Sequence, residues 1–118
     1  MKFTEKNMEG LTVFELEGKI MGDSESISLC KRLKEVIDSG ERHILLDFSS
    51  VRWINSPGIG GILACLNVIR KFGGDLLFTG LSGRVAYYFR ITKLDTTLKI
   101  YEHIDAARRA LVDAEICS

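Results

Sequence analysis

Two short apolar runs, residues 44–46 and 76–78, limit the possible folds more strongly than any other part of this sequence. Neither run alternates apolar with polar residues, which is the pattern of a strand covered on both faces. Each run precedes a longer segment whose apolar residues recur at helical spacing. Strand–helix–strand units of this kind pair their strands in parallel, with right-handed crossovers. The sequence therefore predicts an α/β fold with a mostly parallel sheet covered by helices.

The remaining patterns complete the order β-β-α-β-α-β-α-β-α. Residues 14–17 alternate apolar with acidic side chains, as in a strand with one solvated face, and residues 1–4 are expected to pair with them as a short antiparallel N-terminal edge. The expected helices begin at Asp23 or Ser24, at Pro57, after Ser82 and at Ile104, and a last strand covers residues 98–101. Residues 1–118 are predicted to form a single domain, because no linker, repeat or low-complexity segment interrupts them.

Charge and hydropathy narrow the class of protein. Sixteen basic residues balance sixteen acidic ones, so no net field attracts nucleic acid or an anionic membrane. Charged side chains at Lys2, Glu5 and Lys6 stand where a signal peptide would be apolar. The longest apolar run, residues 59–66, is far too short for a membrane span. We expect a cytoplasmic protein, a monomer or weak dimer, without direct nucleic-acid or membrane partners.

The three cysteines, Cys30, Cys65 and Cys117, are widely spaced and odd in number. This spacing argues against a disulfide framework and against a Cys-x-x-Cys metal site. Cys30 and Cys65 lie within apolar helical patterns, so both are expected to be small core side chains, reduced in the cytosol.

The segment with the most chemical content is Asn55-Ser56-Pro57-Gly58-Ile59-Gly60. Ser56 directly before Pro57 is typical of a helix N-cap followed by proline at the first helical position. A helix N-terminus presents unpaired N–H groups and partial positive charge, which suit a phosphate. Asp47 follows the same strand, so we expect it at the same edge of the sheet. The glycines, including Gly61, would let a phosphate or another backbone come close.

On local pattern alone, two interpretations of Ser56 remain open. It is either only a helix cap or a site where phosphate is added and removed. Among its neighbours, Trp53 is expected to fill the core rather than to present an apolar surface beside Ser56. Arg84 and Arg90, on the third helix, are expected to face solvent.

Other kinds of site find less support. The glycines match neither a Walker A loop, which needs a following Gly-Lys-Ser/Thr, nor G-x-G-x-x-G, so a nucleotide site is only weakly indicated. Neither His43 nor His103 is expected near Ser56, which leaves a Ser-His hydrolase unsupported. No His or carboxylate cluster has metal-ligand spacing, and neither a metal nor a cofactor is expected.

Two motifs together resemble the STAS domain, a family that covers anti-sigma-factor antagonists and the cytoplasmic domains of sulfate transporters. They are Leu46-Asp47-Phe48-Ser49-Ser50-Val51 and Asn55-Ser56-Pro57-Gly58-Ile59-Gly60. Further landmarks are Gly18-Lys19-Ile20, Gly73-Gly74-Asp75-Leu76 and Leu94-Asp95-Thr96-Thr97-Leu98, so the resemblance spans nearly the whole chain. The usual family motif is Asp-Ser-Ser/Thr-Gly-Leu-Gly; Asn55, Pro57 and Ile59 depart from it, whereas Ser56 is kept.

The resemblance implies a freestanding antagonist that is a substrate and a switch rather than an enzyme. Ser56 would be the phosphoacceptor. The surroundings of this phosphosite, where the partner binds, would be Asp47, Asn55, Pro57, Gly58, Ile59 and Gly60. A serine kinase that is also the anti-sigma factor would phosphorylate Ser56, and a PP2C-type phosphatase would reverse the step. The unmodified form would bind the kinase and free the sigma factor. A constitutive STAS scaffold or interaction domain is one alternative, and a small nucleotide-binding protein is another.

Overall fold

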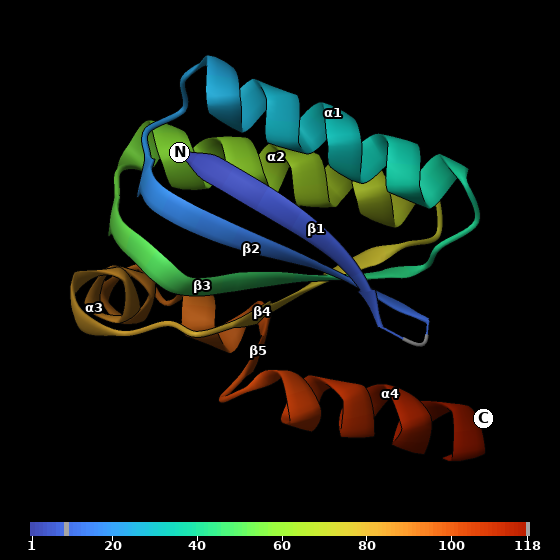
Figure 1. The fold of residues 1–118 in the computed structure, drawn as a ribbon. Helices are drawn as coiled ribbons and strands as arrows, with labels where there is room; N and C mark the ends of the chain where they lie inside the picture. Colours follow the sequence, from blue (N-terminus) through green and yellow to red (C-terminus); the bar gives the residue numbers. More distant parts are fainter. Residues whose placement is uncertain (9, 118) are drawn as a thin grey trace.

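The computed structural model describes residues 1–8 and 10–117, and its description of side chains ends at residue 112. A central sheet carries helices on both faces (Figure 1). The strands are β1 (Lys2–Met8), β2 (Leu11–Ile20), β3 (His43–Ile54), β4 (Asp75–Thr79) and β5 (Lys99–Tyr101), and the helices are α1 (Ser24–Asp38), α2 (Ser56–Lys71), α3 (Gly83–Ile91) and α4 (Ile104–Cys117), with a 3-10 turn at Leu94–Thr96. Helices α1 and α2 lie side by side on one face, and α4 lies on the other (Figure 1).

The order of strands across the sheet is β1-β2-β3-β4-β5. β1 runs antiparallel to β2, and the other neighbouring pairs are parallel. This confirms the α/β fold, the order β-β-α-β-α-β-α-β-α and the antiparallel N-terminal edge that the sequence predicts. β1 is longer than residues 1–4, because every residue from Lys2 to Met8 pairs with β2.

β3 extends well beyond the apolar run that predicts it. From His43 to Asp47 it lies between β2 and β4, and from there to Ile54 it continues beside β2. Four fully buried side chains occupy its first half. The second half carries the chain from the centre of the sheet to the start of α2, so its length decides where that helix begins.

A bulge near the end of β3 turns two neighbouring side chains to the surface. Gly18 pairs with Val51 and Lys19 pairs with Trp53, which leaves Arg52 as an extra residue in β3. Such a bulge breaks the alternation of faces along a strand. Arg52 and Trp53 are therefore both exposed, and the exposed fraction of Trp53 is 38%. The expectation that Trp53 fills the core is wrong, because the bulge shifts it out of the buried register.

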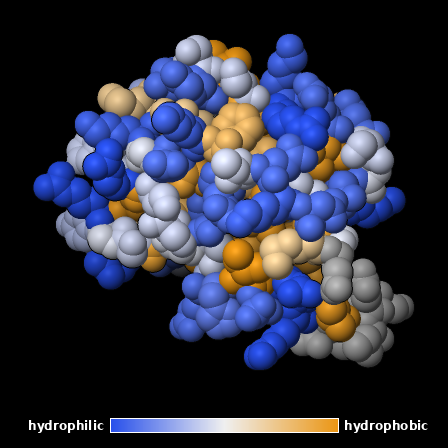
Figure 2. Space-filling view, in the orientation of Figure 1, coloured by the Kyte–Doolittle hydropathy of each residue, from blue (hydrophilic) through white to orange (hydrophobic). Residues whose placement is uncertain are grey.

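Apolar side chains form a layer on each face of the sheet. The larger layer lies beneath α1, α2 and α3, where the rings of Phe48, Phe78 and Phe89 meet with centroids 5.9–6.2 Å apart and attach α3 to the sheet. The smaller layer lies beneath α4 and includes Ala107. Hydrophilic residues cover most of the face shown in Figure 2. No helix in the described part of the chain has the length and apolar character to cross a membrane.

A disulfide joins Cys30 in α1 to Cys65 in α2, with the two Cα atoms 5.8 Å apart. The expectation of two reduced core thiols is therefore wrong. The cysteines are 35 residues apart in the sequence, but α1 and α2 pack side by side and bring them to one contact between helices. A Cα separation of this size is normal for a disulfide. The side chain of Cys117 lies outside the described residues.

Candidate functional site

The turn from β3 into α2 forms the candidate site, and Asn55, not Ser56, is the N-cap of α2. The Oδ1 atom of Asn55 accepts a hydrogen bond from the N–H of Gly58 at 2.8 Å, and its carbonyl oxygen accepts one from Ile59 at 3.0 Å. Ser56 is the first helical residue and Pro57 the second. The prediction is wrong by one residue, because asparagine is as good a cap as serine. Proline has no N–H and the donor of Gly58 is occupied, so few backbone donors remain for a phosphate here.

The side chain of Ser56 is exposed and meets α3. Its Oγ atom lies 2.9 Å from the hydroxyl oxygen of Tyr88, and either group can donate the hydrogen bond. The sequence places Tyr88 on the apolar side of the third helix and gives no sign of this contact. The contact exists because α3 packs beside the far end of β3, which is a property of the tertiary fold.

The glycines after Ser56 have different roles. A Cβ atom at Gly58 would collide with the carbonyl oxygen of Ile20, so the start of α2 lies directly against the end of β2. Cβ atoms at Gly60 and Gly61 would meet nothing within 4 Å. The requirement for close approach within this chain therefore holds for Gly58 and not for the other two. Ile59 is buried against the core and anchors the helix start.

Asp47 lies in the middle of β3 and away from Ser56. Its Oδ1 atom accepts hydrogen bonds from the backbone N–H of Ser49 at 2.9 Å and from the Ser49 hydroxyl at 2.6 Å. From Asp47 to Ile54 the strand continues for roughly 20 Å, at about 3.3 Å per residue. The expectation that Asp47 and Ser56 share one edge is wrong, because β3 continues past the residues that pair with β4.

Beside Ser56 lies a surface that the sequence did not reveal. Five side chains line it, and we call it the basic patch: Lys19, Met21, Arg52, Trp53 and Arg84. The guanidinium of Arg84 lies over the Trp53 ring, with its Cζ atom 5.8 Å from the ring centroid. Arg84 precedes Tyr88 by one helical turn, so the patch adjoins the Ser56–Tyr88 contact. These residues come from β2, β3, α3 and the segment after β2, so no local motif could have shown them together.

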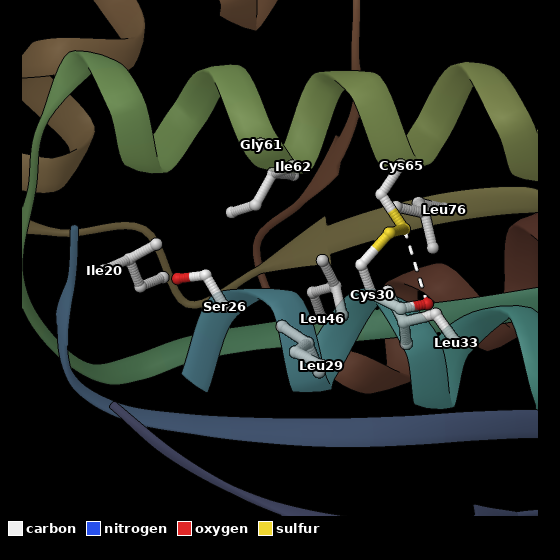
Figure 3. Close-up of a pocket in the computed structure, with 10 residues that line it drawn as sticks. All are labelled: Ile20, Ser26, Leu29, Cys30, Leu33, Leu46, Gly61, Ile62, Cys65 and Leu76. Carbon is white, nitrogen blue, oxygen red and sulfur yellow. Dashed lines mark hydrogen bonds between the residues drawn. A yellow bond between two sulfur atoms is a disulfide. The ribbon is translucent and has the colours of Figure 1, made fainter. Parts of the chain in front are cut away.

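A small cavity lies between α1, α2 and the sheet (Figure 3). Mostly apolar side chains line it, and the disulfide closes one end: Ile20, Ser26, Leu29, Cys30, Leu33, Leu46, Gly61, Ile62, Cys65 and Leu76. Its volume is about 20 Å³, and one water needs about 10–15 Å³, so this cavity has no room for a nucleotide. Within the described residues, no three His, Cys, Asp or Glu side chains form a group that could hold a metal.

Comparison with known proteins agrees with the fold. The STAS domain model matches residues 3–107. BtrV of Bordetella bronchiseptica, named as an anti-sigma factor antagonist, is 25% identical over 97% of each chain. The crystal structure of TM1081 of Thermotoga maritima, described in the same terms, superposes with a TM-score of 0.80 at 24% identity, over 92% of each chain.

SpoIIAA of Bacillus shares the fold in two solved forms. The unphosphorylated form superposes with a TM-score of 0.69 at 14% identity, over 95% of this chain and 98% of SpoIIAA. The phosphorylated form gives the same TM-score at 16% identity, over 92% and 99%.

Proposed function

Because the chain belongs to the STAS domain family, we propose that it is an anti-sigma factor antagonist switched by phosphorylation of Ser56. The unmodified protein binds a serine kinase that is also the anti-sigma factor, and this binding frees the sigma factor. A PP2C-type phosphatase removes the phosphate. In this role the chain is a cytoplasmic substrate and binding module, and it has no catalytic site of its own.

The exposed hydroxyl of Ser56 at the start of α2 carries this proposal. A kinase must reach the hydroxyl and accommodate it in its own active site. The hydrogen bond to Tyr88 is the contact that must open, and a hydrogen bond of this kind contributes about 1 kcal/mol. Ser56 is thus available at small cost, while the buried Gly58 and Ile59 hold the helix start in place.

The solved forms of SpoIIAA support a fold that tolerates phosphate. That protein has been solved both with and without phosphorylation, and this chain superposes equally well on both. We expect the same tolerance here. The phosphate adds roughly −1.5 to −2 charges at neutral pH. At an exposed helix N-terminus, a negative charge is stabilised by about 0.3–1 kcal/mol.

Phosphorylation of Ser56 should prevent binding of the partner. A charged group pressed into an interface without a counter-ion costs several kcal/mol to desolvate, on the order of 2–5 kcal/mol. This cost exceeds the stabilisation that the N-terminus of α2 gives to the phosphate. Phosphorylation should therefore release the partner without unfolding the domain.

Phosphotransfer and binding can be measured separately. Incubation with the cognate serine kinase and ATP should add one phosphate, detected by intact mass. Ser56→Ala should abolish the addition, and Ser82→Ala is the matched control because Ser82 is also an exposed serine at the start of a helix. Ser56→Asp should keep the circular dichroism spectrum of wild type and weaken kinase binding by at least about tenfold. Equal affinity of Ser56→Asp and wild type would contradict the proposed switch.

A constitutive interaction domain is the second candidate. The Ser56–Tyr88 hydrogen bond and the proline directly after Ser56 favour it, since both restrict the acceptor. A constitutive domain would take up no phosphate and would bind its partner equally well as wild type and as Ser56→Asp. Binding of ATP or GTP at millimolar concentration would instead favour a small nucleotide-binding protein.

A further inference from the structure

We propose that the basic patch is a docking surface for an acidic segment of a partner protein that also presents an apolar side chain. The patch consists of Lys19, Met21, Arg52, Trp53 and Arg84. This inference rests on the proposed function and deepens it, because it specifies the chemistry of the partner that meets the chain beside Ser56.

Among the described residues, the cations of the patch have no ion-pair partner. In the described residues, the ion pairs involve other cations, such as Lys6 with Glu15 and Arg32 with Glu5, and none involves Lys19, Arg52 or Arg84. The whole chain has a formal net charge of zero. Three cations on one surface, none of them in an ion pair with another described residue, therefore make a local positive potential that attracts an anionic partner.

The patch forms where the regular pairing between β2 and β3 is interrupted. The bulge in β3 leaves Arg52 unpaired and exposes it together with Trp53, opposite Lys19 of β2. Bulges of this kind are concentrated next to functional sites, where they re-aim side chains. A regular strand would have sent Arg52 and Trp53 to opposite faces of the sheet.

The apolar part of the patch fits a protein partner. Trp53 is 38% exposed and Met21 is 45% exposed, and Arg84 already lies over the Trp53 ring. Tryptophan and arginine dominate the energetics of protein interfaces, and methionine adapts its shape to a partner. Three cations on a neutral chain fall short of the long basic stripe that follows a nucleic-acid backbone. An acidic segment with one apolar anchor matches both the positive charge of the patch and its exposed apolar side chains, Trp53 and Met21.

The position of the patch connects it to the switch. Trp53 lies three residues before Ser56, and Arg84 lies one helical turn before Tyr88, which contacts Ser56. A phosphate on Ser56 would place negative charge beside the patch, where it would compete for the cations and repel an acidic partner.

The patch contains its own reporter, because Trp53 is the one tryptophan in the sequence. The probe is a capped ten-residue peptide of glutamates with a central leucine, titrated into the unphosphorylated protein. We expect a saturable change in Trp53 fluorescence, and the affinity derived from it should fall as the salt concentration is raised. Arg52→Glu should lower the affinity of the protein for the peptide by at least about tenfold. Arg109→Glu is the matched control, because it makes the same charge change at an exposed position of α4.

Several outcomes would overturn the inference. Equal affinity of Arg52→Glu and Arg109→Glu for the peptide would show that the patch does not bind it. If oligouridylate, or vesicles containing phosphatidylserine, bound more tightly than the peptide, the patch would be assigned to nucleic acid or to a membrane instead.

Measurements of kinase binding and phosphotransfer distinguish failure of this inference from failure of the proposed function. If Ser56→Asp weakens kinase binding but Arg52→Glu does not, the patch inference fails and the switch stands. If the peptide binds the patch but the kinase transfers no phosphate to Ser56, the switch fails and the docking surface stands.

Discussion

Replacing Gly58 by alanine should destabilise the fold, whereas the same change at Gly60, two residues further along α2, should stabilise it. An added Cβ atom at Gly58 would collide with the carbonyl oxygen of Ile20, which belongs to the backbone of β2. An added Cβ atom at Gly60 would meet nothing within 4 Å. The two variants share one helix and one chemical change, so their difference isolates the packing of α2 on β2.

The magnitudes follow from opposing contributions. Glycine in a helix interior costs about 1 kcal/mol relative to alanine, and this gain is available at both positions. At Gly58 the collision adds an overpacking cost of about 1–3 kcal/mol. A shift of the helix start also endangers the 3.2 Å hydrogen bond from the Asn55 N–H to the Ile20 carbonyl, which contributes about 0.5–1.5 kcal/mol. We expect Gly58→Ala to lose about 1–3 kcal/mol and Gly60→Ala to gain about 0.5–1 kcal/mol.

Urea denaturation and thermal unfolding, each followed by circular dichroism, measure the stability of both variants. At roughly 3–5 °C per kcal/mol for a domain of this size, their melting temperatures should differ by about 5–20 °C. Gly58→Ala with a free energy of unfolding equal to or above that of wild type would refute the close contact between α2 and β2. A loss of stability in Gly60→Ala would refute the open space beside that residue.

Three further predictions concern the cap, the disulfide and one carboxylate. Asn55→Ala should lower the free energy of unfolding by about 1 kcal/mol in urea, whereas Asn55→Asp, which keeps the capping oxygen, should not; equal loss in both would exclude the cap. Thiol titration of the denatured, unreduced protein should find one reactive thiol per chain rather than three, and reducing the Cys30–Cys65 bond, which closes a 35-residue separation, should cost about 3–4 kcal/mol. Partial burial would raise the pKa of the Asp75 carboxyl, but hydrogen bonds from Lys99 and a neighbouring arginine lower it below its ordinary value of 3.8. The stability that Asp75 contributes is thus present above pH 3.8 and is lost as the pH falls through the lower pKa of the folded state. Asp75→Asn should therefore be less stable than wild type at neutral pH and should lose less stability on acidification. An identical dependence of unfolding free energy on pH in the variant and in wild type would contradict this.

Periodic patterns predicted the fold because they depend on which faces of each element are covered. Residues 44–46 and 76–78 are buried on both faces between α1, α2 and α4, so they show no alternation. The helices also begin within one residue of their expected starts. β3 is the exception, since its second half is bulged and half-exposed and therefore shows neither strand period.

The candidate site was predicted less completely, because its geometry depends on the bulge in β3 and on tertiary contacts. The sequence located Ser56 at the start of α2, but the cap is formed by Asn55, one residue earlier. Which of two neighbouring polar residues caps a helix depends on where the strand before it ends. The exposure of Trp53 follows from the extra residue in β3, which composition does not reveal. The contact of Ser56 with Tyr88 needs α3 to pack beside β3.

The bulged end of β3 and the start of α2 carry the proposed phosphoacceptor and two residues of the basic patch, and this has a consequence for how the domain tolerates substitutions. Ser56, Arg52 and Trp53 are exposed, so charge can be added or removed there without opening the core. The residues that hold the turn in place, Gly58 and Ile59, are buried behind them. Substitutions at the exposed positions should therefore alter binding at nearly constant stability. Substitutions at the buried positions should alter stability first, and binding through the displaced helix start.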